Sequence, residues 1–169
     1  MAESDIVRTN TQSSGVPAFI ADCHLGKLAK YLRLFGFDTL YFNSIDDDDL
    51  IAMANKEGRT ILTRDRALYE RGEASCLYLK PRDTRGQLEL VIAELGLKQV
   101  CRPFVRCLVC NTPLQPIDKD AVANKVPPKV ARFFDTFEIC PVCDKVFWHG
   151  DHYKRMRLFV EAVLQELSV

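Results

Sequence analysis

Two Cys-x-x-Cys pairs constrain the folding of this chain more than any other feature of its sequence. Cys107 and Cys110 form the first pair, Cys140 and Cys143 form the second, and 29 residues lie between the pairs. Zinc binds four soft ligands at the corners of a tetrahedron, and two turns of this spacing supply four thiolates with little strain. Because the protein fills all four positions, the pattern predicts a structural zinc ion in a zinc ribbon that carries an inserted helix.

Other uses of these side chains remain open. Buried thiols or two redox-active pairs would have the same spacing, although two such pairs in one small module are less expected. His149 and His152 follow the second pair and are alternative zinc ligands. Since four thiolates are available, we expect both histidines at the surface or facing nucleic acid.

Three cysteines lie outside the two pairs. The total of seven is odd, which disfavours a secreted disulfide scaffold and favours a reducing compartment. Cys23 is followed by His24, but adjacent residues rarely form a catalytic thiol–imidazole dyad. We therefore expect Cys23, Cys76 and Cys101 to be packed side chains.

Charge and hydrophobicity limit the class of protein. The chain has 23 basic and 23 acidic side chains, which excludes binding of nucleic acid by bulk attraction alone but not a nuclease with an acidic centre and a basic rim. No apolar stretch approaches the roughly 20 residues that a membrane span requires. Residues 1–16 are polar and lack the apolar core of a signal peptide, so we expect a flexible tail on a cytoplasmic protein without membrane association.

Residues 17–99 alternate between strand-like and helix-like segments. Strands are predicted at residues 18–21, 37–42, 60–63 and 76–79. Helices are predicted between them, ending at Gly36, Gly58 and Gly96. Repeated β-α units with short connections indicate an α/β fold with a mainly parallel sheet flanked by helices.

The sequence changes character near residue 100. Residues 100–151 hold most of the prolines and cysteines and show little periodicity, which predicts a separate zinc-ribbon module. Within it we expect a short helix at 129–134 and a hairpin from 138–139 and 146–148, around the second cysteine pair. Helical spacing returns at residues 152–169, which predicts a C-terminal helix that packs back on the first domain.

Carboxylates follow the predicted strands. Asp22 directly follows the first strand and Asp65 the third, while Asp83 lies just past the fourth, in Lys80-Pro81-Arg82-Asp83. A run from Asp46 to Asp49 opens the helix after the second strand. The carboxyl ends of parallel strands share one edge, where the functional crevice of such sheets lies. Oxygen ligands gathered there suit Mg²⁺ or Mn²⁺, which activate water and neutralise charge during phosphodiester cleavage.

A structural role is the alternative for each of these acids, because aspartate is a favoured N-cap of helices. Asp22 and Asp65 are the less ordinary pair, since capping does not require an acid at both strand ends. Basic residues lie between the acids, mostly in positions suited to surface ion pairs. Lys27 and Arg64, which adjoin the expected ligands, are the best candidates for phosphate contacts.

Several motifs in order resemble the PIN-like RNase domain found at the C-terminus of mutator-seven exonuclease proteins and as free-standing prokaryotic proteins. The matching motifs are Phe19-Ile20-Ala21-Asp22, Leu25-Gly26-Lys27-Leu28-Ala29, Leu32-Arg33-Leu34-Phe35-Gly36-Phe37-Asp38-Thr39, Asp47-x-x-Leu50-Ile51, Gly58-Arg59-Thr60-Ile61-Leu62-Thr63-Arg64-Asp65, Arg106-Cys107-Leu108-Val109-Cys110-Asn111, Cys140-Pro141-x-Cys143 and Trp148-x-Gly150-x-His152. The resemblance covers about residues 18 to 160.

The resemblance implies a PIN-like fold with a C-terminal zinc ribbon, and metal-dependent cleavage of RNA. Asp22 and Asp65 match acidic positions of the family, and Asp47 is the best match in the second motif, with Asp46, Asp48 and Asp49 left open. Asp83 matches a variable fourth position.

The first functional hypothesis is an Mg²⁺- or Mn²⁺-dependent ribonuclease. Asp22, Asp47 and Asp65 would bind the metal, with Asp83 as a further catalytic candidate. The expected RNA contacts are Lys27, Arg33, Arg64, Trp148 and His152. For Trp148, a hydrophobic cover over the zinc turn is an equal alternative.

Two other functions remain open from the sequence. One is a non-catalytic module that binds RNA or a protein partner on the same scaffold. The other is a hydrolase acting on small phosphate esters.

Overall fold

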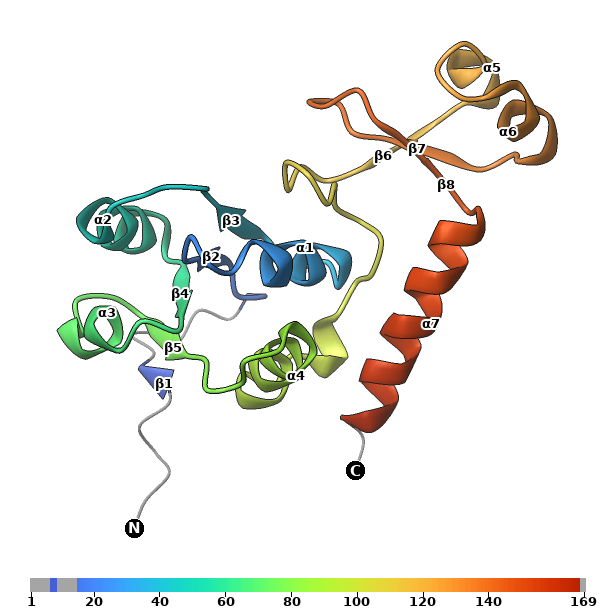
Figure 1. Ribbon diagram of the computed structural model, residues 1–169. Helices are drawn as coiled ribbons and strands as arrows, with labels where there is room; N and C mark the ends of the chain where they lie inside the picture. Colours follow the sequence, from blue (N-terminus) through green and yellow to red (C-terminus); the bar gives the residue numbers. More distant parts are fainter. Residues whose placement is uncertain (1–6, 9–14, 168–169) are drawn as a thin grey trace.

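The larger part of the molecule is a five-stranded sheet covered by helices on both faces (Figure 1). The computed structural model describes residues 7–8 and 15–167. The strand order is β1-β5-β4-β2-β3, in which all neighbours are parallel except β1 and β5. The strands are β1 (Val7–Arg8), β2 (Phe19–Ala21), β3 (Thr39–Tyr41), β4 (Thr60–Thr63) and β5 (Cys76–Tyr78). The predicted α/β fold with a mainly parallel sheet is confirmed.

Strand β1 lies within the segment that we expected to be a flexible tail. Val7 and Arg8 pair with Leu77 and Cys76 on the edge strand β5. The other residues of that expected tail up to residue 14 lie outside the described ones. A two-residue strand has too few side chains to show a period, so the sequence pattern did not reveal it.

Alternating strand residues divide the interior into two hydrophobic cores. Phe19, Ala21 and Leu62 face α1 (Gly26–Leu34) and α4 (Thr84–Glu94). Ile20 and Ile61 face α2 (Asp47–Glu57) and α3 (Arg66–Arg71) on the opposite side. The six residues of α3 were not predicted to be helical, because a helix of less than two turns has no clear hydrophobic period.

Gly36, just after α1, lies in close contact with the backbone of Arg102 in the second part of the chain. Its φ of 94° is accessible chiefly to glycine, and a Cβ here would lie 2.1 Å from the Arg102 carbonyl oxygen. The close approach lets the Arg102 and Phe104 amides donate to the carbonyls of Phe35 and Leu34. The chain leaving α4 and η1 (Lys98–Val100) therefore runs against the end of α1.

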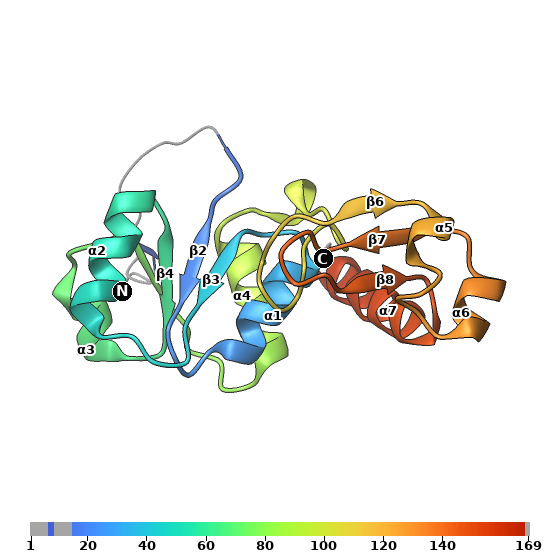
Figure 2. The ribbon, with the colours of Figure 1, turned by 90° about the horizontal axis from the view of Figure 1, so that it is seen from above.

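The second part is a small module around a three-stranded antiparallel sheet (Figure 2). Its elements are β6 (Gln115–Ile117), α5 (Lys119–Val122), α6 (Pro128–Phe133), β7 (Phe137–Ile139) and β8 (Val146–Trp148). The hairpin β7–β8 and helix α6 agree with the sequence prediction, whereas β6 and α5 were not predicted. Val122, Val126 and Phe137 form a separate small core.

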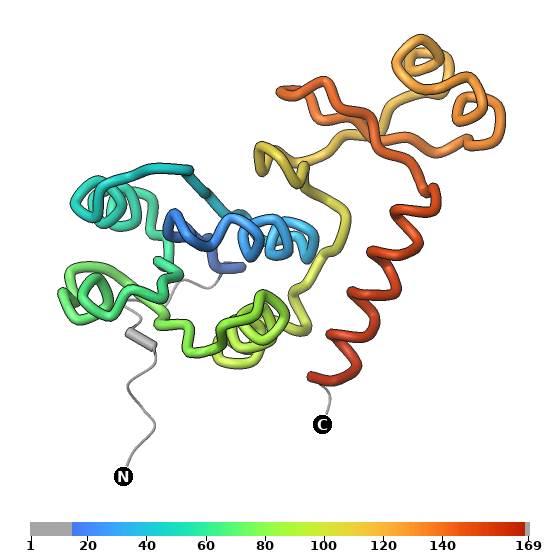
Figure 3. Tube along the Cα trace, viewed as in Figure 1, coloured from blue at the N-terminus to red at the C-terminus, as the bar shows by residue number. Residues whose placement is uncertain are grey.

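Helix α7 (Asp151–Glu166) connects the module back to the first part, as the tube in Figure 3 shows. Val160 and Val163 belong to the main core, and the Phe159 ring lies 4.8 Å from that of Tyr31. Arg85 on α4 pairs with Glu166 near the end of α7 at 2.7 Å. Across the described ranges 7–8 and 15–167, no helix has the length and apolar character needed to cross a bilayer.

Candidate active site and metal centre

The four paired cysteines converge on one point of the second module. Their Sγ atoms all lie within 4.8 Å of one another, and those of Cys110 and Cys140 are 3.3 Å apart. A tetrahedral site with Zn–S bonds of about 2.3 Å has sulfurs about 3.8 Å apart. The cluster therefore fits one zinc ion, with Cys107 and Cys140 buried and the other two thiols half-buried.

The same backbone turn shapes both cysteine pairs. The Asn111 amide donates to the Cys107 carbonyl, and the Asp144 amide donates to the Cys140 carbonyl. Asn111 and Asp144 have φ angles of 71° and 56°, in the left-handed region that asparagine and aspartate enter more readily than most residues. The residue that follows each pair thus favours the turn that brings the thiols together.

The thiols of the cluster differ in their readiness to ionise. Burial opposes ionisation of Cys110, but its hydrogen-bonding interactions with Thr112, Cys143 and Cys140 outweigh that effect and lower its pKa to about 6. The same shared interactions raise the pKa of Cys143. A thiolate is the form of cysteine that binds metal. The polar contacts of Cys110 favour its thiolate and therefore its binding to a zinc ion.

Arg33, on α1 in the first part of the fold, forms hydrogen bonds to the chain of the cysteine cluster. Its side chain is 5% exposed, and its guanidinium donates to the carbonyls of Thr39, Leu108 and Val109. Burial lowers the Arg33 pKa, and the nearby cysteines oppose the shift. Because zinc with four thiolates has a net charge of about −2, this cation also suits the centre electrostatically. The predicted RNA contact of Arg33 is disfavoured by its burial and by the engagement of its Nε and Nη1 groups inside the protein.

Asp38 forms a second link between the two parts. It accepts hydrogen bonds from Arg59 at 2.6 Å and from the Asn111 side chain at 2.8 Å, with Arg106 at 3.9 Å. Burial opposes its charged form, but Arg59 and Asn111 outweigh that effect and lower the Asp38 pKa. The Asn111 side-chain oxygen also accepts from the Thr39 amide. One side chain of the zinc turn therefore contacts both the backbone and a carboxylate of the first part.

Asp22 and Asp65 meet at the ends of the neighbouring parallel strands β2 and β4. The buried Thr63 hydroxyl donates to Asp22 Oδ2 at 2.9 Å, and its oxygen accepts from the Asp65 amide at 2.9 Å. The Asp22 amide donates to the Leu62 carbonyl, which continues the ladder between the strands. Thr63 thus fixes the Asp22 carboxylate beside the start of the chain segment that carries Asp65.

Asp65 has a capping role as well as this position. Its Oδ1 accepts from the amides of Ala67 and Leu68, which makes it the N-cap of α3. Its Oδ2 has no hydrogen bond to any residue that the structure describes. The capping alternative is therefore correct for Asp65, yet one of its oxygens remains available to a ligand.

Asp47 lies in the first turn of α2 and is exposed. Burial is the main cause of the raised pKa of Cys23, followed by a hydrogen bond from the thiol to Asp22 and the charges of Asp22 and Asp47. Asp47 is therefore within electrostatic reach of the chain that follows Asp22. Cys76 and Cys101 are buried, as expected of packed cysteines, while Cys23 is half-buried.

Asp83 does not share the pocket of these acids. Its Oδ1 accepts from the Gly86 amide at 2.8 Å, so that Asp83 caps α4. Its neighbours Arg82 and Thr84 line the pocket at the strand ends, but Asp83 itself does not. For this residue, the capping alternative accounts for the observed geometry.

Asp22 and Asp65 line a pocket of about 560 Å³ with a strongly basic rim. The cations of its lining are Lys27, Arg64, Arg66 and Arg82. In residues 15–167, only the four cysteines bring three or more metal-binding side chains within 4.8 Å of one another. Mg²⁺ usually binds one or two carboxylates and keeps several waters, so two aspartates with a free oxygen fit such an ion.

A family model described as the Mut7-C RNAse domain matches residues 17–160. The chain belongs to the Mut7-C RNAse domain family. The description of the family indicates a nuclease-type function, with RNA as the substrate. Searches of curated proteins and of solved structures found no match.

The remaining expected RNA contacts of this Mut7-C domain lie in two places. Lys27 and Arg64 are exposed at the acidic pocket. Trp148 and His152 lie near the start of α7, where Trp148 also packs against the small core of the zinc module. Trp148 therefore has a hydrophobic packing role in the module, and it also lines a pocket.

Sequence reasoning missed the roles of Thr63, Asn111 and Asp38. All three stand within motifs that carried the resemblance, but nothing in the motifs says which side chain they contact. A polar residue that ends a buried strand, such as Thr63, is the one local signal of an internal hydrogen-bond role.

Proposed function

We propose that this Mut7-C domain is an Mg²⁺- or Mn²⁺-dependent ribonuclease whose four-cysteine cluster carries a structural zinc ion. One observation carries the proposal: the Thr63 hydroxyl joins Asp22 to the Asp65 backbone at a pocket with a basic rim. Metal-assisted cleavage of a phosphodiester requires carboxylates that bind the metal ion and, beside them, basic side chains that bind the phosphates.

The residues of the chain have separate tasks in this proposal. Asp22 and Asp65 would hold the ion, with Asp47 as a third carboxylate reached through water. When bound, Mg²⁺ or Mn²⁺ lowers the pKa of a coordinated water and neutralises charge on the phosphate. The hydrogen bond from Thr63 keeps the Asp22 carboxylate in one orientation, which reduces the cost of ordering the site.

Basic side chains would position the substrate. Lys27 and Arg64 lie on the rim beside the acids, and their cations suit the phosphates on either side of the cleaved bond. Asp83 has no part in the proposed reaction, because its carboxylate caps α4.

A neighbouring groove supports a polymeric substrate over a small phosphate ester. It measures about 570 Å³, runs between α1 and α7, and shares Lys27 with the acidic pocket. Lys30, His152 and Arg155 add further positive or polar groups along it. A basic groove that continues beyond the acids can follow several phosphates of one strand. We expect the enzyme to act in the cytoplasm.

A non-catalytic RNA-binding module is the second candidate. The same groove would hold RNA without any reaction. In that case Asp65 would serve only as the N-cap of α3 and would bind no metal ion. Binding of a divalent ion at Asp22 distinguishes the two, because a pure binding module does not need it.

The test is cleavage of labelled single-stranded RNA in the presence of Mn²⁺. Wild type is compared with Asp22→Asn, which keeps the size of the side chain and one of the two acceptor oxygens used by Thr63 and the Cys23 amide, but weakens metal binding. Asp120→Asn is the matched control, since Asp120 is an exposed acid on α5 in the zinc module. Equal zinc content in all three proteins excludes a loss of folding.

We expect wild type and Asp120→Asn to cleave, and Asp22→Asn to lose at least about 100-fold in rate, of the order measured when one charge-stabilising group is removed. Equal cleavage by all three proteins would refute the proposed centre. RNA binding without cleavage by any of them would favour the binding module.

A further inference from the structure

A pocket of about 310 Å³ lies where the β7–β8 hairpin of the zinc module faces the start of α7. Four aromatic residues line it: Phe104, Phe147, Trp148 and Tyr153. Its volume is at the lower end of the range for small-molecule sites. The cleavage chemistry proposed above uses none of these side chains.

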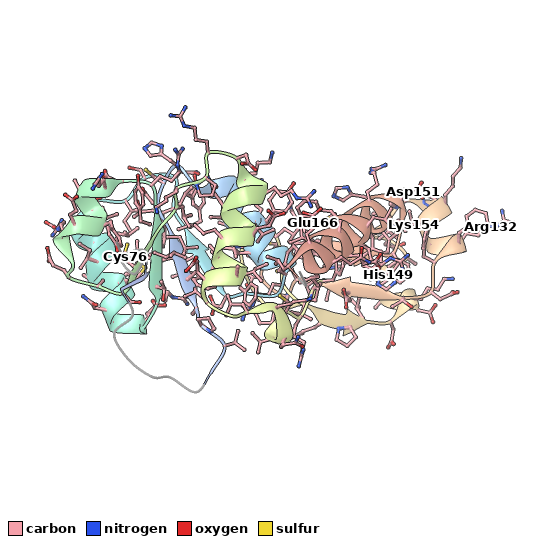
Figure 4. All side chains as sticks on the ribbon, turned by 90° about the horizontal axis from the view of Figure 1, so that it is seen from below. Cys76, Arg132, His149, Asp151, Lys154 and Glu166 are labelled. Atoms are coloured by element: carbon pink, nitrogen blue, oxygen red, sulfur yellow. The ribbon has the colours of Figure 1, made fainter. Side chains whose placement is uncertain are left out.

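Three rings lie side by side along the pocket: His149 stacks on Tyr153, and Phe104 lies against Tyr153 at a tilt of 45°. His149 and Tyr153 lie 4.0 Å apart with an angle of 15° between their planes, and Tyr153 lies 4.4 Å from Phe104. Phe104 has a φ of 65°, which is uncommon for an aromatic residue and is held by its amide donating to Leu34. Figure 4 labels His149 at the start of α7, in the part of the molecule away from Cys76. A flat ring system is the natural complement of such a surface.

Glu138 is one of two carboxylates that line the pocket, and the other, Asp151, pairs with Lys154 at 3.5 Å. Glu138 lies half-buried on β7, opposite Phe147 on β8, and its carboxylate has no hydrogen bond or ion pair to another described residue. Arg106, a cation that also lines the pocket, donates instead to the carbonyls of Gly36 and Asn111. A half-buried carboxylate without protein donors keeps both oxygens free to accept from a ligand in the pocket.

These features select one class of ligand. An ionised carboxylate has two acceptor oxygens and accepts best from two adjacent N–H groups. Among the four RNA bases, guanine presents such a pair on its Watson–Crick edge, N1–H and the exocyclic N2 amine. Adenine and cytosine have an acceptor nitrogen beside their amine, and the one N–H of uracil stands between two carbonyls.

We propose that this pocket binds a single unpaired guanine of the RNA, which stacks on the aromatic side chains and donates to Glu138. The inference rests on the proposed RNA substrate, and it adds a preference for one base.

The pocket is continuous with the groove that leads to the acids. Leu34, Leu108, His152 and Met156 line both this pocket and the groove between α1 and α7, and Lys27 lines both that groove and the acidic pocket. From Lys27 to Leu34 helix α1 rises about 10 Å. A guanine in the pocket would thus fix the bond to be cleaved a few nucleotides away.

The single tryptophan of the chain makes the proposal directly measurable. Trp148 lines the pocket, so its fluorescence reports occupancy without any cleavage. The four nucleoside 5′-monophosphates are titrated without divalent metal, and all share the same phosphate. We expect the 5′-monophosphate of guanosine to change the fluorescence and to bind at least tenfold more tightly than the other three.

Glu138→Gln tests the role of the carboxylate, since it keeps the size of the side chain. We expect it to lower the affinity for the guanine nucleotide at least tenfold, while Glu94→Gln, at an exposed glutamate of α4, leaves it unchanged. Equal affinity of wild type for all four nucleotides, or no response to any, overturns the proposal independently of any variant.

The two proposals fail in different ways. Cleavage of RNA by a protein that shows no preference for guanine would refute the base pocket alone. Binding of the guanine nucleotide by a protein that never cleaves RNA would refute the nuclease and leave the pocket standing.

Discussion

Arg33→Met tests the link that joins the zinc centre to the parallel sheet. The substitution keeps most of the apolar stem and removes a guanidinium that donates to Thr39, Leu108 and Val109 at 2.9, 3.1 and 2.9 Å. Hydrogen bonds to charged groups contribute roughly 1.5–3 kcal/mol each, which sets an upper limit for the loss.

The expected loss is smaller than that limit because water replaces part of the interaction. Val109 is 53% exposed, so solvent reaches its carbonyl, whereas Thr39 is fully buried and its carbonyl loses a partner. An unsatisfied buried group costs about 1–3 kcal/mol, and removal of a buried charge returns part of its desolvation cost. We therefore expect unfolding free energy to fall by about 3 kcal/mol.

Equilibrium urea unfolding of the zinc-loaded protein measures this loss. At a slope of about 2 kcal/mol per molar urea, the midpoint falls by about 1.5 M. Trp148 reports on the zinc module and circular dichroism on the whole chain, so the two transitions should separate in Arg33→Met. Lys30→Met, at an exposed position of the same helix, should change stability by less than about 0.5 kcal/mol.

Two results would refute this reasoning. Equal midpoints for Arg33→Met and Lys30→Met would show that the guanidinium does not stabilise the junction. A loss of RNA affinity with unchanged stability would restore Arg33 as an RNA contact.

Three further predictions concern the metal centre, the junction and the acids. Cys140→Ser should lower zinc affinity by more than about 100-fold in a competition assay with a chelator, because even changes behind the ligands cost about 10–100-fold. Asp38→Asn should be less stable than wild type at neutral pH, and acid titration of unfolding should show the difference shrinking below about pH 4. A lowered folded-state pKa contributes stability above the unfolded value, and that stability disappears as pH falls through the folded one. Asp65→Asn should keep the α3 cap, since asparagine caps as well as aspartate, but should lose RNA cleavage. Asp83→Asn should keep both its helix cap and RNA cleavage. Equal RNA cleavage rates in the two variants would contradict the assignment.

Features that depend on neighbours in the sequence were predicted well. Helix α2 begins within the aspartate run and ends at Gly58, whose φ of 64° gives the left-handed cap that glycine favours. Strand β4 has the predicted bounds of Thr60 and Thr63. Local periods and end signals determine such elements, whereas the short α3, β6 and α5 have too few residues to show one.

The candidate site was predicted in outline from the topology of the sheet. Parallel strands place their carboxyl ends on one edge, so acids after β2 and β4 must lie near each other whatever the packing details. The sequence could not show which carboxylate oxygens have no hydrogen bond from the protein. Asp65 and Asp83 both follow a strand and cap the next helix, and the Thr63 hydroxyl and the pocket lining distinguish them.

The sequence by itself determined the four-cysteine cluster, the α/β alternation and the edge of the sheet that carries Asp22 and Asp65, because residue spacing and hydrophobic period act within short stretches of chain. Tertiary structure decided the hydrogen-bond partners of Arg33, because the carbonyls of Leu108 and Val109 belong to residues 75 and 76 positions away. It also decided the aromatic pocket, which joins Phe104, Glu138 and Tyr153 from three separate segments. Such contacts depend on how preformed elements pack against one another, and no local pattern in the chain records that packing.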